Sequence, residues 1–183
     1  VADIYQLLVG KANTDVELTV NVIPSALGSR KVIVKTISEE GNLYYYNWVE
    51  HNIHYVDSVS HGQVGYLHIP NMGEEGLNMF MKLFYPQINR AALIIDDRGN
   101  GGGFVSPLIT ERLAKQIVFW DMMRNGQPTP DPDEQCGPKV CLINEYSASD
   151  GDIFPYRFKT YKLGKVIGKR SWGGVVGIRG SLP

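Results

Sequence analysis

Two kinds of apolar pattern alternate along the chain from residue 63 onward. Short, nearly continuous apolar runs are typical of strands that are covered on both faces, and apolar residues at three- and four-residue spacing are typical of helices. The predicted strands are 64–69, 91–95, 117–120, 140–143 and 163–168, and the predicted helices are 74–85, 105–114 and 150–161. This alternation favours an α/β domain with a largely parallel sheet.

The first 37 residues have a different pattern. A short helix that stops at Gly10 precedes two alternating strands, at 16–22 and 31–37. So few elements cannot close a core of their own. We therefore expect residues 1–37 to be the later part of a domain.

Mixed three- and four-residue spacing over 43–59 predicts an amphipathic helix inside a connecting segment, 38–62. Residues 63–183 then form the main domain. A glycine-rich run at 173–180 is followed by no further closing element, so we expect this domain to be truncated at its C-terminus.

Composition narrows the class of protein. The 183 residues are 43% hydrophobic and 20% charged, as in a soluble globular protein, and the formal net charge is -1. This balance gives no reason to expect a nucleic acid or a polybasic membrane contact. No apolar run reaches the roughly 18 residues of a membrane span. The start of the chain lacks the basic and apolar segments of a signal peptide.

The two cysteines, Cys136 and Cys141, lie five positions apart with no cluster of Cys or His near them. This spacing fits neither a zinc site nor a disulfide framework. A reducing, cytoplasmic location is the simplest interpretation, and we expect no metal and no cofactor.

A glycine-rich loop, residues 96–103, connects a predicted buried strand to a predicted helix. Phe104 stands where a dinucleotide fingerprint needs a glycine, and the Gly-Lys-Ser/Thr ending of a phosphate loop is missing. Two interpretations stay open. The loop is a tight turn, or its consecutive N–H groups form a cradle for an anion.

A second loop, residues 144–152, also leads from a strand into a helix, and it contains Ser149 and Asp150. Free N–H groups at a helix start favour developing negative charge, so Ser149 is a candidate nucleophile. The Asp150 amide and the amide of Gly102 or Gly103 would then be the donors of an oxyanion hole. The alternative is that Ser149 only caps the helix, since the more specific Gly-x-Ser-x-Gly motif is absent.

Four blocks together resemble the tricorn-type branch of the C-terminal-processing serine peptidases. These blocks are GYLHIPNMG (65–73), LIIDDRGNGGG (93–103), NEYSASDGD (144–152) and GKRSWGGVVG (168–177). The resemblance implies an α/β, ClpP/crotonase-like layered catalytic domain at 63–183, preceded by the C-terminal part of a PDZ-like domain at 1–37. It also implies a serine endopeptidase that acts on oligopeptides and forms homo-oligomers as a full-length protein.

The resemblance assigns roles to particular residues. Ser149 falls on the family nucleophile, and Asp150 and Gly103 fall on the oxyanion-hole positions. Asp121 falls where tricorn-type enzymes attract a basic P1 side chain, although an ordinary aspartate at a strand end is the alternative. The Ser-His pair and the Glu of the family lie outside this sequence, so we expect this chain alone to be close to inactive.

No general base is apparent within the chain. Gly174 stands where the Ser-Lys branch of these peptidases carries its lysine, and Lys165 and Lys169 are better interpreted as surface charges. The histidines offer no clear alternative: His51 and His54 predict an exposed helix face, His61 an exposed loop and His68 a structural role within a strand.

Two alternatives to a peptidase remain. One is a non-catalytic, peptide-binding scaffold with a PDZ module, in which Ser149 only caps a helix. The other is a crotonase-like acyl-CoA site, which would also use paired backbone N–H groups, but the serine after the strand argues against it.

Overall fold

The computed structural model describes residues 3–130 and 134–177, so part of the glycine-rich run predicted at 173–180 lies outside the described residues. Contacts divide the chain into two compact units, Val1–Trp48 and Val49–Pro183. The helix predicted at 43–59 is present as α1, Gly41–Val59. The assignment of three parts with boundaries at 37 and 62 stays a prediction.

The first unit contains a 3₁₀ helix, η1 (Ile4–Leu8), and two strands, β1 (Asp15–Val20) and β2 (Arg30–Lys35). The strands form an antiparallel pair. None of residues 3–48 is buried, which agrees with the expectation that this segment has no closed core. Its membership of a PDZ-like domain stays a prediction.

The second unit is built on a parallel sheet with the strand order β3-β4-β7-β8. Its strands are β3 (Val64–His68), β4 (Ala92–Asp96), β7 (Lys139–Ile143) and β8 (Gly164–Gly168). The helices between them are α2 (Glu74–Phe84), which continues into the 3₁₀ turn η2 (Tyr85–Gln87), α3 (Ser106–Ala114) and α4 (Asp150–Thr160). The predicted α/β class and parallel sheet are confirmed.

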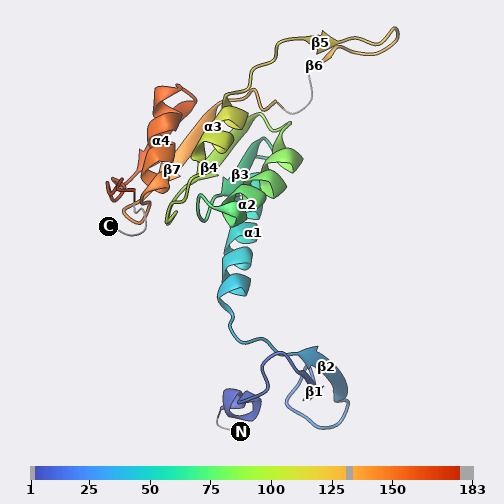
Figure 1. Cartoon of the computed structure of the whole chain (residues 1–183). Coiled ribbons are helices and arrows are strands. Elements are labelled where there is room, and N and C mark those ends of the chain that lie inside the picture. The colour runs from blue at the N-terminus through green and yellow to red at the C-terminus, as the bar shows by residue number, and fades with distance from the viewer. Residues whose placement is uncertain (1–2, 131–133, 178–183) are drawn as a thin grey trace. The chain divides into compact units, whose positions relative to one another are not determined.

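Each crossover connects a strand to its neighbour in the sheet, and the order always progresses from β3 towards β8. Because parallel crossovers are almost always right-handed, this order places α2, α3 and α4 on one face, and Figure 1 shows the three helices along the sheet. The face that they cover carries Leu67, Ile95 and Cys141, which are paired across neighbouring strands and are fully buried. Four helical phenylalanines complete this core: Phe80, Phe84, Phe154 and Phe158.

The prediction that residues 117–120 form a strand of the main sheet is wrong. Only Trp120 and Asp121 form a strand, β5 (Trp120–Asp121), which pairs antiparallel with β6 (Thr129–Pro130). The apolar side chains of Val118 and Phe119 are exposed rather than buried. In Figure 1 this hairpin extends away from the parallel sheet. An apolar run alone therefore did not distinguish a core strand from an exposed hairpin.

The four core strands are parallel, so the loops that follow them lie at one edge of the sheet. In α/β sheets this carboxyl edge is where ligands bind. Here it brings together the segments after β3, β4, β7 and β8, which include both loops singled out in the sequence.

Candidate active site

The loops after β3, β4 and β7 are joined by backbone hydrogen bonds. The Met72 N–H donates to the Gly102 carbonyl over 2.8 Å, and the Phe104 N–H donates back to the Met72 carbonyl over 2.7 Å. The Ala148 N–H donates to the Asn100 carbonyl over 2.8 Å. The glycine-rich loop therefore lies between the other two and contacts both.

Two glycines of this loop are required by space as well as by conformation. A Cβ at Gly102, whose φ is +95°, would lie 2.6 Å from the Ser149 Cβ and 3.0 Å from the Asp150 nitrogen. A Cβ at Gly103, whose φ is +148°, would lie 2.1 Å from the Met72 carbonyl oxygen. Real Cβ contacts are longer than this, so only glycine lets the loop approach the Ser149 turn so closely.

Ser149 has an unusual backbone conformation, with φ 56° and ψ −119°. A non-glycine residue at positive φ is uncommon, and such residues concentrate at functional sites. Ser149 occupies the N-cap position of α4, yet its side chain makes no capping hydrogen bond. A strained serine between a strand and a helix is also the geometry of a nucleophile elbow, whereas a capping role would use the hydroxyl.

Ser147, the other serine of this loop, is in a different state. It is fully buried, its hydroxyl donates to the Asp97 carbonyl over 2.8 Å, and the same oxygen accepts the Asn144 N–H at 3.3 Å. Its hydrogen-bonding capacity is used within the loop. The Ser147 hydroxyl therefore serves the structure, which leaves Ser149 as the candidate for chemistry.

The candidate oxyanion donors can be told apart by their partners. In the described part of the chain, the N–H groups of Asp150 and Gly103 donate to no protein acceptor. The Gly102 N–H, by contrast, donates to the Asn100 Oδ1 over 2.9 Å. This bond argues against Gly102 as a donor to a ligand. Because Gly102 has no side chain, it instead leaves room for the Ser149 turn to pack against the loop.

Asn100 and the Asp150 side chain hold these groups in place, and sequence reasoning missed both roles. Asn100 is fully buried, and its Nδ2 donates to the Ile69 carbonyl over 3.1 Å. The Asp150 carboxylate accepts the Ser106 N–H at 3.0 Å and the Ser106 hydroxyl at 2.5 Å. Asp150 thereby ties the start of α3 to the start of α4. The only feature of the sequence that could have pointed to Asn100 is its position among glycines, between Gly99 and Gly101.

A buried acid lies directly before this loop. Asp97 is fully buried, and neither carboxyl oxygen has a hydrogen-bond partner among the described residues. Burial, and to a lesser degree the neighbouring carboxylates of Asp96, Asp150 and Asp152, raise the pKa of Asp97 well above its usual range. Burial therefore favours the neutral form of the Asp97 side chain.

Asp97→Asn should flatten the dependence of stability on pH. Above the pKa of about 3.9 in the unfolded chain, the folded state keeps the Asp97 proton and the unfolded state loses it. The free energy of unfolding therefore falls as the pH rises towards the folded pKa, by at most about 1.4 kcal/mol per pH unit. Urea unfolding between pH 4 and 8 should show a shallower slope for the variant. An unchanged slope, as expected for the exposed control Asp15→Asn, would contradict this account.

The candidate bases lie where the sequence predicted. His51, His54 and His61 are exposed. His68 is buried with its Nε2 2.9 Å from the Arg98 carbonyl, and burial lowers the pKa of this imidazole. Lys169 is exposed and pairs with Glu145 at 2.9 Å. The Ser149 hydroxyl makes no hydrogen bond within the described ranges, 3–130 and 134–177.

Asp121 is not brought to Ser149 within this chain. It is exposed at the end of β5, on the hairpin that extends from the sheet (Figure 1). Its proposed contact with a basic side chain stays a prediction.

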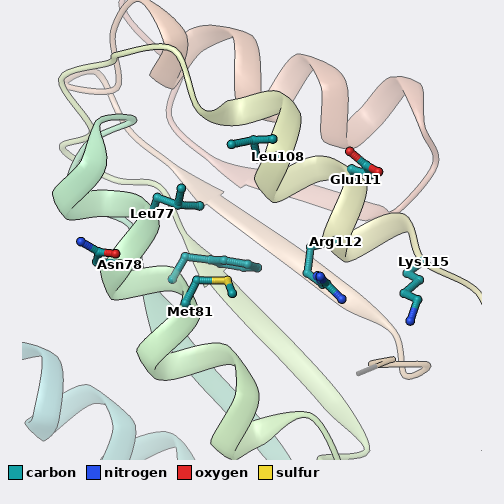
Figure 2. A pocket seen from close by; sticks show the side chains of 8 residues that line it. Leu77, Asn78, Met81, Leu108, Glu111, Arg112 and Lys115 are labelled. Carbon is teal, nitrogen blue, oxygen red and sulfur yellow. The ribbon is translucent and has the colours of Figure 1, made fainter. Parts of the chain in front are cut away.

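A separate groove lies between α2 and α3 (Figure 2). Leu77, Met81 and Leu108 give it an apolar lining, with Arg112 and Lys115 at its charged end. It contains none of the predicted site residues.

No helix among the described residues is long and apolar enough to cross a membrane.

The sheet and the three interlocked loops belong to a known class of protein. Residues 63–183 match peptidase family S41, and the chain therefore belongs to this family of serine-type peptidases. The predicted resemblance to the tricorn-type branch is confirmed by individual relatives. The chain is 44% identical over 179 residues to the tricorn protease homolog of Saccharolobus solfataricus, and 42% identical over 178 residues to the tricorn protease of Thermoplasma acidophilum.

The solved structure of tricorn protease agrees with these relatives. It matches 96% of this chain with a TM-score of 0.85 at 42% identity. The matches cover only 16% of each of the two relatives and 17% of the chain in the solved structure. The chain thus spans about one sixth of the length of the proteins that it matches.

Proposed function

We propose that this chain carries the nucleophile and the oxyanion hole of a serine peptidase that acts on oligopeptides. The observation that carries the proposal is the state of Ser149: a positive φ and a hydroxyl without a capping bond. Next to it are two N–H groups, of Asp150 and Gly103, without acceptors in the described part of the chain. Any helix start leaves an N–H group such as that of Asp150 unpaired, but a helix cap would need neither the strained backbone nor the second free N–H group, on Gly103.

In the proposed mechanism, the Ser149 Oγ attacks the carbonyl carbon of the scissile peptide bond, and its proton passes to a general base. The carbonyl oxygen becomes an oxyanion that accepts the N–H groups of Asp150 and Gly103. Collapse of this intermediate breaks the C–N bond and releases the amine with the proton. Water then hydrolyses the acyl-enzyme by the same route in reverse.

The base in this mechanism is a histidine outside the present sequence. This assignment rests on the family resemblance and on the exposed or engaged state of the four histidines described above. We propose that the chain is the C-terminal portion of a longer cytoplasmic protein, with a PDZ-like segment at 1–37 and a ClpP/crotonase-like domain at 63–183. The longer protein would form homo-oligomers, and Asp121 would attract a basic P1 side chain.

Covalent labelling tests the nucleophile. A phosphonofluoridate should modify Ser149 in a full-length protein that includes the Ser-His segment, with the adduct located by peptide mapping. Ser149→Ala should abolish both labelling and turnover of an oligopeptide, by at least about a thousandfold. Ser58→Ala, at an exposed position on α1, is the matched control and should change neither. Turnover that survives Ser149→Ala would refute the assignment.

The alternative function is a peptide-binding scaffold. Its expected result is different, because such a protein would bind oligopeptides with no labelling of Ser149. The free hydroxyl favours the enzyme, since a scaffold would have no use for an uncapped, strained serine.

A further inference from the structure

Asp152 lies three residues after Ser149, in the first turn of α4, and only 8% of it is exposed. Its Oδ1 accepts the Gly173 N–H at 2.7 Å, and its Oδ2 accepts the Gly174 N–H at 3.2 Å. Both carboxylate oxygens are therefore used by a segment about twenty residues further along the chain. No basic side chain pairs with Asp152 in the part of the chain that the structure describes.

The segment that Asp152 holds has no regular secondary structure. It follows β8, and it begins at Lys169, whose N–H donates to the Ile143 carbonyl. The Trp172 N–H donates to the Ser147 carbonyl over 2.9 Å. Three consecutive N–H groups, at 172–174, thus contact the loop that contains Ser149, and two of them do so through Asp152. Hydrogen bonds to a carboxylate are stronger than those between neutral groups. Asp152 therefore supplies two of the stronger bonds of this attachment, and the exposed Lys169–Glu145 pair supplies another.

The attached segment forms a wall of a hollow beside α4. Residues from both sides line it: Asp152, Ile153 and Tyr156 from the helix, and Ser171, Gly173 and Val175 from the segment. This hollow borders the first turn of α4, which begins directly after Ser149. On the proposed function, a small reagent needs only the Ser149 hydroxyl and the N–H groups of Asp150 and Gly103.

Other contacts hold the nucleophile itself. The Ala148 N–H bonds to the Asn100 carbonyl, and the Asp150 carboxylate bonds to Ser106. None of these bonds involves the Asp152 side chain, and the Asp152 N–H, which donates to the Ser149 carbonyl over 2.9 Å, is kept in a side-chain variant. Loss of the Asp152 carboxylate therefore releases the wall and leaves the reacting groups in place.

We propose that Asp152 is a positioning residue that fixes residues 172–174 beside the nucleophile for the binding of extended peptides. This inference rests on the proposed function. It assigns to Asp152 no contact with the reacting atoms.

The test compares two readouts of Asp152→Asn in the full-length protein. Asparagine keeps the shape of the side chain but turns an NH₂ group towards one of the two N–H donors. kcat/KM for an oligopeptide should fall about tenfold to a hundredfold, as expected for loss of a hydrogen bond to a charged group, mainly through a higher KM. The rate of labelling by a small phosphonofluoridate should stay within about twofold of wild type. Amide hydrogen exchange at Gly173 and Gly174 should become faster.

Glu111→Gln is the control, because it removes an exposed carboxylate from α3, outside both the 144–152 loop and the held segment. It should change none of the three readouts. Equal losses of labelling and peptide turnover in Asp152→Asn would show a general structural role and overturn the inference. Unchanged peptide kinetics in Asp152→Asn would also overturn it, provided that the wild-type protein is labelled at Ser149. A wild-type protein that is not labelled would instead overturn the proposed function, and this inference with it.

Discussion

Gly102→Ala should destabilise the chain by about 3 kcal/mol and abolish labelling of Ser149 in the full-length protein. The added Cβ would lie 2.6 Å from the Ser149 Cβ and 2.8 Å from the Ala148 carbonyl oxygen. Both atoms belong to a turn that is held on its other side by α4. The loop must therefore move away from Ser149, and Gly103 moves with it. Urea unfolding measures the first effect, and mass spectrometry of the adduct measures the second.

Gly101→Ala is the matched control in the same loop. A Cβ at Gly101 would meet nothing within 4 Å, so this variant should fold and react almost as the wild type does. Comparable losses in the two variants would mean that neither glycine tolerates a side chain, and the close contact between Gly102 and Ser149 would then not explain the loss.

Asp150→Ala should lower the free energy of unfolding by about 2 to 4 kcal/mol. The buried carboxylate accepts two hydrogen bonds from Ser106, one of them from the N–H at the start of α3. Removing it leaves two buried donors without a partner. The backbone N–H that we assign to the oxyanion hole remains, so the labelling that persists in the folded fraction should separate the two roles of this residue. Thermal or urea unfolding gives the stability.

Glu111→Ala removes a carboxylate from the exposed side of α3 and is the control for Asp150→Ala. It should change the stability by no more than about 0.5 kcal/mol. A loss for Asp150→Ala as small as this would contradict the claim that its side chain joins the two helices.

The core strands could be predicted because their sequences are apolar on both faces. Runs such as 91–95 have few other uses in a soluble protein, and β4 is indeed flanked by β3 and β7. The run at 117–120 has a similar composition, yet its side chains are exposed on a hairpin. Local composition cannot tell these apart, because the difference lies in which strands are available as neighbours.

The candidate site was predictable only in part. A serine at a strand-to-helix junction and a glycine-rich loop are local features, but they left a helix cap and a tight turn open. The resemblance to the tricorn-type branch was needed to assign roles to Ser149, Asp150 and Gly103. The choice between Gly102 and Gly103 depends on the Asn100 side chain, which takes up the Gly102 N–H. The role of Asp152 depends on Gly173, twenty-one residues away. Contacts of this kind follow from the fold and have no local signal.

The two free N–H groups come from different crossovers of the sheet: Gly103 follows β4, and Asp150 follows β7. They come together only after these two strands have paired, and the long connection through α3 and the β5–β6 hairpin delays that pairing during synthesis. A partly folded chain therefore has a serine but no place to stabilise an oxyanion. On the proposed function, the oxyanion hole therefore exists only in a chain whose sheet is complete.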